Sequence, residues 1–213
     1  MAETGTRAPQ GADTPDRRTY ALYTLAVVAA GWIIAAVNTG ISYLALGLVA
    51  IPIVTGLIGC LAVVTLLRLL HCAWWLAVLS AAPALFVLVG SVQYAPEAAL
   101  DSRGVRETVR ITADSAEDHG GGNHRFTLVG EAGELDETLD WNGSFPDWRV
   151  GDRIEIVRDP EGVVPLEAAT DVDPGGRLTG LLLGGTGWTA LTLLAGLRGF
   201  TRRRAGRRPV FDD

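Results

Sequence analysis

The sequence predicts an α-helical membrane protein in which an all-β domain, a small barrel or sandwich, is inserted between the third and fourth of four transmembrane helices. From Thr19 to Tyr94 the only charged side chain is Arg68. That run is long enough for three crossings, because one helix needs about 20 apolar residues to cross a bilayer. A second apolar stretch, residues 178–197, carries no charge. Between the two lies a polar segment whose residues alternate as they do in strands.

The chain begins with a polar segment, residues 1–19, which we expect to be a disordered cytoplasmic N-terminus. The first transmembrane helix should follow over residues 20–37. The triplet Asn38-Thr39-Gly40 then interrupts the apolar run with residues that favour turns. The sequence therefore predicts a short hairpin between the first two helices at this triplet.

The second and third helices should complete the segment 20–94. The second is expected over 41–67, and Pro52 in its middle removes a backbone hydrogen bond, so a kink is predicted there. The third is expected over 69–94. Two tryptophans near its start and Tyr94 at its end are typical of aromatic side chains at the depth of the lipid headgroups.

Residues 95–177 are expected to fold as an acidic β-domain. Alternating polar and apolar residues predict five short strands, over 105–113, 125–129, 135–141, 153–158 and 163–166. Five such strands joined by tight turns are typical of a small barrel or sandwich. The apolar residues expected to form its core are Leu128, Leu139, Trp141, Phe145, Trp148, Val150, Ile154 and Ile156.

The fourth helix, over 178–197, precedes a basic tail, 198–213, that we expect in the cytoplasm. Short arginine-rich flanks stay on the cytoplasmic side, which places both termini inside and the β-domain outside. Charge agrees, because residues 95–177 hold nineteen acids against eight arginines, and the rest of the chain holds five acids against ten arginines. All eighteen basic residues are arginine, a bias typical of high-GC bacteria, so the expected location is a plasma membrane.

One segment of the β-domain carries a family resemblance. Residues 147–159 read Asp-Trp-Arg-Val-Gly-Asp-Arg-Ile-Glu-Ile-Val-Arg-Asp and are followed by Pro160. This pattern resembles bacterial integral membrane proteins of actinobacterial type and unknown function, whose small extracytoplasmic β-domain ends in Val-Gly-Asp, a strand and Asp-Pro. The earlier half of the domain lacks the central Tyr-x-Pro element of that family. The resemblance implies the fold and no known activity.

Catalytic, cofactor-binding and metal-binding residues are not expected. His119 and His124 bracket a glycine-rich loop without a third ligand at a set spacing, which favours a solvated hairpin loop. An acidic group with the oxygen ligands that calcium prefers fails the EF-hand spacing, which would place Thr138 first and Arg149 last. The residues of this group are Asp136, Glu137, Asp140, Asn142 and Asp147. No nucleophile elbow is present, and without lysine a phosphate-binding P-loop is excluded.

These features favour a non-enzymatic plasma-membrane protein that presents its β-domain to an envelope protein, a peptide or a wall component. The alternative is a small-molecule permease, or an accessory subunit of a transporter. An exposed apolar patch on the β-domain would favour the first, and polar side chains facing inward from several helices the second. The expected partners are the lipid bilayer and an envelope protein or a helix packed on Gly180 and Gly184; nucleic acid is not expected.

Overall fold

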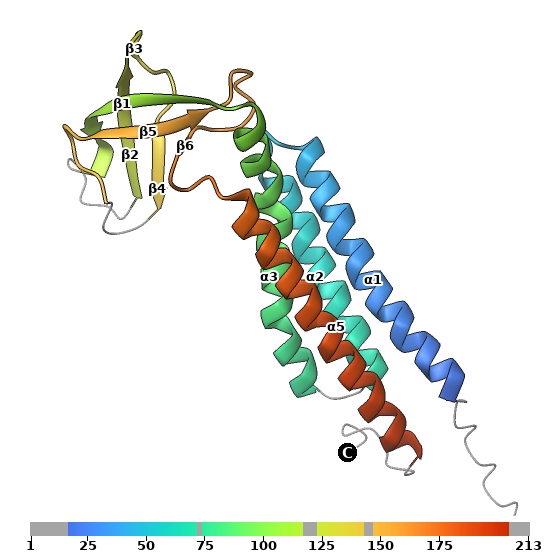
Figure 1. Cartoon of the computed structure of the whole chain (residues 1–213). Coiled ribbons are helices and arrows are strands. Elements are labelled where there is room, and N and C mark those ends of the chain that lie inside the picture. The colour runs from blue at the N-terminus through green and yellow to red at the C-terminus, as the bar shows by residue number, and fades with distance from the viewer. Residues whose placement is uncertain (1–16, 72–73, 117–122, 143–146, 205–213) are drawn as a thin grey trace, which may run out of the picture.

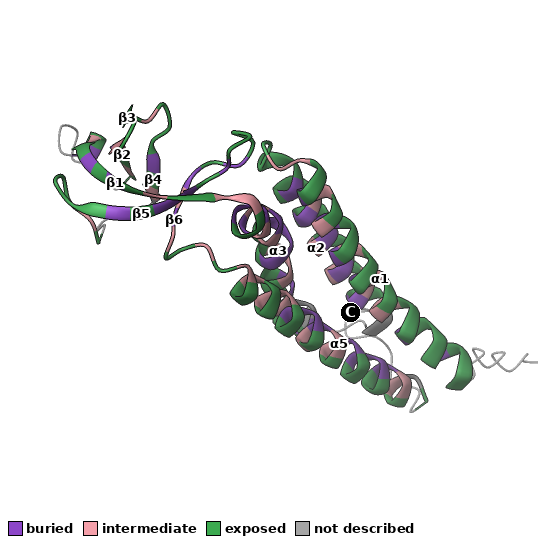
Figure 2. Ribbon diagram, turned by 45° about the horizontal axis from the view of Figure 1, so that its top comes forward, coloured by how far each residue is buried: buried purple, intermediate pink, exposed green. Residues whose placement is uncertain are grey.

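The computed structural model describes residues 17–71, 74–116, 123–142 and 147–204. Four long helices form a bundle, and an open antiparallel sheet lies at one end of it (Figure 1). The helices are α1 (Arg17–Leu44), α2 (Ala50–His71), α3 (Trp74–Arg103) and α5 (Pro174–Arg204). All four are long and apolar enough to cross a membrane. Figure 2 shows that the helix surfaces turned away from the bundle are exposed, and their large residues there are mostly apolar.

The expected turn at Asn38-Thr39-Gly40 is wrong, because α1 continues to Leu44 and the connection to α2 follows it. The Asn38 side chain is 4% exposed and points into the bundle. Its amide nitrogen donates to Ser91 Oγ at 2.8 Å, and Thr55 Oγ1 donates to its amide oxygen at 2.6 Å. Within a bilayer the backbone must satisfy its own hydrogen bonds, so the helix persists and the side chain finds partners on α2 and α3.

Other helix boundaries in the structure also differ from the predicted ones. Pro52 lies in the first turn of α2, where a proline costs little, so the predicted kink in the middle of the helix is wrong. α3 does not end at Tyr94 but runs on to Arg103, with Pro96 inside it. The additional turns carry Glu97 and Arg103 beyond the apolar span, and the first strand follows after Gly104 alone.

Small residues allow α3 and α5 to pack closely. A Cβ atom at Gly184 of α5 would lie 2.8 Å from both the Pro83 carbonyl oxygen and the Val87 amide nitrogen of α3. A Cβ at Gly180 would meet no atom within 4 Å. Small residues allow such close backbone approach between membrane helices, and at Gly184 the neighbour belongs to the same chain.

The sheet contains six strands, all paired antiparallel, in the order β3-β2-β1-β5-β6, and β4 also pairs with β2. The barrel expectation is wrong, because no ladder joins the two ends of this sheet. β4 and β6 are too short to close it, and the contact between their segments includes a 3.3 Å hydrogen bond from Leu166 N to Glu137 Oε2. The strands are β1 (Val105–Asp114), β2 (Asn123–Gly130), β3 (Gly133–Glu134), β4 (Leu139–Asn142), β5 (Arg153–Arg158) and β6 (Glu167–Ala168).

The core of the sheet agrees with most of the predicted residues. Leu128, Leu139, Ile154 and Ile156 are buried in it, and Trp141 and Trp148 pack against it, as expected. Val150 is 40% exposed, because it belongs to the turn before Gly151 rather than to a strand. Phe145 lies outside the described residues. The core also includes residues that the sequence analysis did not place there, namely Val109, Ile111, Phe126, Leu166 and Ala168.

Tight turns with a glycine at positive φ lie at both ends of β5. Gly151 has φ of 101°, and Asp152 N donates to the Arg149 carbonyl oxygen at 3.0 Å. Gly162 has φ of 65°, and its N–H donates to the Asp159 carbonyl oxygen at 3.0 Å. Glycine populates positive φ without the steric cost that a Cβ brings, so these two positions fix the ends of β5.

Candidate functional site

The sheet is attached to the bundle by two ion-pair clusters at the end of the helices. In the first, Glu97 of α3 is buried, and its Oε1 accepts from Arg177 Nε of α5 at 2.5 Å. Its other oxygen accepts from the backbone N–H of Asp173 at 3.0 Å. A buried carboxylate is tolerated only when it is paired and hydrogen-bonded, and here the partners come from the residues that lead into α5. The pair therefore ties the end of α3 to the start of α5.

The second cluster joins α3 to the turn after β5. Arg103 donates to Asp159 Oδ2 at 2.8 Å and to Glu161 Oε2 at 2.7 Å. Asp159 also accepts backbone N–H bonds from Glu161, Val163 and Val164. These backbone bonds and the Arg103 guanidinium hold the pKa of the Asp159 carboxyl below its ordinary value, although burial acts in the opposite direction. The Asp159-Pro160 turn noted in the sequence thus binds Arg103 at the end of α3.

An apolar cluster lies between these two ion-pair clusters. Ala99 and Leu100 of α3 pack with Val157 of β5 and Val164 of the following loop. Leu46, from the connection between α1 and α2, packs against the same cluster. Polar and apolar contacts therefore fix the sheet on the helix ends, and any site on the sheet has a fixed position relative to the bundle.

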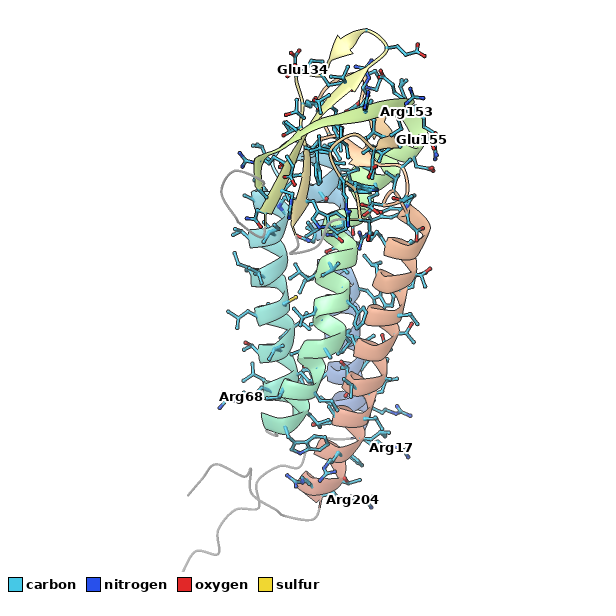
Figure 3. All side chains as sticks on the ribbon, turned by 90° about the vertical axis from the view of Figure 1, so that its left-hand side faces the viewer. Arg17, Arg68, Glu134, Arg153, Glu155 and Arg204 are labelled. Atoms are coloured by element: carbon cyan, nitrogen blue, oxygen red, sulfur yellow. The ribbon has the colours of Figure 1, made fainter. Side chains whose placement is uncertain are left out.

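A groove of about 410 Å³ runs along β5 where β6 ends. The polar and aromatic residues that line it are Arg106, Trp148, Asp152, Arg153, Glu155 and Thr170. Figure 3 shows Arg153 and Glu155 on the surface of the sheet domain. Trp148 is half-buried and makes edge-to-face contacts with Trp141 and Phe126, with ring centroids 5.3 and 6.3 Å apart. The groove therefore combines a fixed aromatic wall with charged side chains.

The backbone of β5 is open beside this groove. β6 pairs only with Ile156 and Val157, and Ala169 N donates to the Glu155 carbonyl oxygen at 2.9 Å on the same side. Peptide groups alternate in direction along a strand, so the N–H and C=O of Arg153 point to the side where β6 has ended. Among the described strands none pairs with Arg153 on that side.

Unpaired arginines flank the groove. Arg110 and Arg153 are direct cross-strand partners on β1 and β5, and like charges placed opposite one another destabilise a sheet. Within the described ranges neither of them forms an ion pair, and neither does Arg106. The lining of the groove also includes Asp152 and Glu155, so it carries charges of both signs, and its arginines are the ones left without an ion-pair partner in the described ranges.

The residues weighed earlier as metal ligands lie apart or have other partners. His124 Nδ1 lies 2.7 Å from Asp114 Oδ2, and His119 lies outside the described residues. In the acidic group, Asp140 pairs with Arg125 at 3.5 Å and Glu137 accepts from Leu166 N. In the part of the chain that the structure describes, no three His, Cys, Asp or Glu residues are grouped as metal ligands.

The bundle interior holds more polar side chains than its sequence suggests. Most of them bond within the chain: Thr24 and Thr192 donate to carbonyl oxygens of their own helices, and Ser42 donates to the Val92 carbonyl oxygen of α3. Between the four helices, beside Asn38, lies a cavity of about 30 Å³. Trp188 Nε1 is buried at this cavity without a hydrogen-bond partner among the described residues. The cavity has room for about one water molecule.

Fold and site together define a multi-pass membrane protein whose open sheet is fixed to one end of a four-helix bundle. No protein-family model, curated protein or solved structure matches the chain. Sequence reasoning missed Arg153 and Trp148 as site residues, since it assigned Trp148 to the core and treated Arg153 as the solvent face of a strand. The sequence shows Arg110 and Arg153, but it does not show the strand register that places these two arginines opposite each other.

Proposed function

We propose that this chain is a non-enzymatic plasma-membrane protein that binds an extended peptide segment of an envelope protein at the groove beside β5. The open backbone at Arg153 is the observation that carries the proposal. An extended peptide that adds to a sheet edge gains main-chain hydrogen bonds there, and neighbouring pockets read its side chains. The proposal takes the sheet to be extracytoplasmic, which the arginine-rich flanks of the helices support.

The side chains around the groove indicate what the peptide carries. Arg106, Arg110 and Arg153 lack acidic partners in the described ranges, so an acidic side chain on the peptide would relieve the repulsion between Arg110 and Arg153. Trp148 offers a half-buried aromatic surface, a residue type enriched among the energetically dominant contacts of interfaces. The large apolar residues exposed on the described part of the sheet domain are Val105, Val150 and Val163, so the binding surface is polar rather than an apolar patch.

The test is site-specific photo-crosslinking in living cells. A photoreactive residue at Thr170, inside the groove, should give a discrete adduct with another protein. The matched control is a photoreactive residue at Glu131, which is exposed on the same domain away from the groove. Adducts that are the same from both positions, or absent from the groove, would contradict the proposal.

A backbone variant then separates strand addition from simple surface contact. Arg153→Pro removes the outward N–H, and an edge position whose N–H faces solvent tolerates proline. We expect this variant to lose the Thr170 adduct while the domain keeps its protease resistance. Arg153→Ala keeps the N–H and should weaken the adduct only in part. A full adduct with Arg153→Pro would show that the partner does not pair with β5.

The alternative, a small-molecule permease or a transporter subunit, is favoured by the polar interior of the bundle and by the lack of a large exposed apolar patch on the described part of the sheet domain. Polar side chains face the interior of the bundle, and those that are buried include Thr24, Asn38, Ser42, Ser80, Ser91 and Thr192. The cavity beside Asn38 admits about one water molecule, so transport would require the helices to separate. Reconstituted protein that moves a solute across vesicles, and loses this activity with Asn38→Leu, would favour the permease.

A further inference from the structure

A second groove lies between α1 and α5 at the arginine end of the bundle, the end opposite the sheet. Its volume is about 380 Å³, within the ~300–1,000 Å³ range of ligand pockets. Its base is formed by the buried Tyr20 and Thr24 and by Gly196, where a Cβ would lie 2.4 Å from Thr24 Oγ1. Leu193 and Leu197 line one wall and are exposed to the surrounding medium. The groove is thus mainly apolar and lies on the membrane-facing surface of the bundle.

The mouth of this groove is cationic. Arg17 lines it, and Figure 3 shows Arg17 and Arg204 at the same end of the bundle. Every Asp and Glu in the described ranges lies between Glu97 and Asp173, near or within the sheet at the other end. Arg17 therefore has no carboxylate partner within those ranges. An exposed arginine at the mouth of a groove can donate hydrogen bonds to a phosphate group.

We infer that the groove between α1 and α5 is a binding site for an anionic phospholipid, with an acyl chain between the helices and the headgroup phosphate at Arg17. Lipid is the occupant that matches both parts, because the walls are apolar along the helices and the charge lies only at the mouth. Basic pockets between transmembrane helices bind anionic headgroups in this way. A second copy of the chain packed on this face would bring its own arginine end against this one, and like charges would oppose that contact.

The test uses the purified full-length protein in detergent and native mass spectrometry. We expect phosphatidylglycerol to bind more tightly than phosphatidylcholine with the same chains. Arg17→Gln should weaken phosphatidylglycerol binding by about fivefold, the effect expected for one arginine near an anionic headgroup. Arg68→Gln is the matched control, because Arg68 is exposed at the same end of the bundle but on the other side of it from Arg17 (Figure 3), and it should leave this affinity unchanged.

A groove-filling variant tests the apolar part separately. Ala21 is an exposed residue that lines the groove, so Ala21→Trp should reduce binding of both lipids while leaving the unfolding temperature of the protein unchanged. Inorganic phosphate should not displace the lipid, because it lacks the acyl chain. If Arg17→Gln and Arg68→Gln lose the same phosphatidylglycerol affinity, the arginines act by general charge attraction and the proposed site is wrong. Equal affinity of the wild-type protein for both lipids would overturn it as well.

Discussion

Glu167, on β6, lies beside the ion pair that ties α3 to α5. Burial first, and then the neighbouring carboxylate of Glu97, raise the pKa of Glu167 to about 7, with Asp171 adding to the rise and Arg177 opposing it. The Arg177 guanidinium is already bonded to Glu97. When Glu167 is ionised, its negative charge therefore lies beside the Glu97 carboxylate, and the nearby Arg177 guanidinium is already paired with Glu97.

This arrangement predicts a junction that loosens as pH rises. The folded chain holds the Glu167 proton up to about pH 7, whereas an unfolded glutamate, with its ordinary pKa of 4.5, loses it earlier. Between these values the folded state holds the Glu167 proton and the unfolded state does not, so the contribution of Glu167 to stability is greatest below pH 4.5 and is lost as pH rises to 7. Amide hydrogen exchange over 167–173, corrected for intrinsic rates, should show protection decreasing through this window.

Glu167→Gln should abolish that dependence, because glutamine stays neutral at every pH. At pH 8 the variant should be better protected than the wild-type protein. Glu134→Gln is the control, since Glu134 is exposed on β3 at the other end of the strand order from β6, and it should keep the wild-type profile. If Glu167→Gln and the wild type follow the same curve, the titrating group lies elsewhere.

Among the strands, β5 contacts both the core of the sheet and the end of α3. It pairs with β1 over its whole length and with β6 at Ile156 and Val157. Ile156 is fully buried in the core of the sheet, whereas Val157 faces the apolar cluster at the helix ends. One strand therefore contributes to the core of the domain with one face and to the junction with the other.

Ile156→Asp should unfold the sheet domain. Burying an unpaired carboxylate costs several kcal/mol, a cost comparable with the stability of about 5–15 kcal/mol of a typical domain. We expect limited proteolysis of the detergent-solubilised protein to cut the segment 105–168 in this variant and not in the wild type.

Arg158→Ala provides the comparison two residues away. Arg158 is exposed and pairs with Glu107 at 3.5 Å, and exposed ion pairs contribute about 0–1 kcal/mol. Its protease resistance should remain close to that of the wild type. Resistance of Ile156→Asp equal to that of Arg158→Ala would mean that the strand register is wrong.

The element boundaries show what a single sequence can and cannot predict. Helix number, the strand alternation around Ile154 and Ile156 and the turn glycines follow from local chemistry, and the structure agrees with them. Asn38 and Pro52 misled the prediction because their local preference for turns is outweighed by context. A polar side chain with two partners on other helices does not end a helix, and those partners are distant in sequence.

The site could not be predicted for the same reason. The groove beside β5 exists because β6 is only two residues long and the sheet stays open, and neither property is encoded in residue alternation. Trp148 is expected in the core as a large apolar side chain, and the structure agrees that it packs there. The sequence could not show that this ring also borders a groove at the end of a ladder.

At the scale of the molecule, charge divides the chain into two ends. The described acids lie at the sheet end, and Arg17, Arg68 and Arg204 lie at the other, as Figure 3 shows. Because arginine-rich flanks favour the cytoplasmic side, we predict that the sheet is exported and that both termini are cytoplasmic.

Reporter insertion checks this orientation. Alkaline phosphatase, which is active only outside the cytoplasm, should be active when inserted in the turn between β2 and β3 at Ala132 and inactive when fused after Asp213. A fluorescent protein that matures only in the cytoplasm should give the opposite pattern at the same two positions. Phosphatase activity after Asp213 would contradict the orientation.

Because α3 continues almost directly into β1, a change in the tilt of the helix moves the sheet. Gly104 alone separates them, and a Cβ there would lie 2.2 Å from the Leu100 carbonyl oxygen and 2.4 Å from Val157 Cγ1. Helices change their tilt when the bilayer thickens or thins, and with both ion-pair clusters intact the sheet must turn with α3. The tip around Glu134, which Figure 3 shows at the top of the sheet domain, moves with the rest of the sheet, so a change in membrane thickness becomes a sideways movement of the sheet outside the membrane.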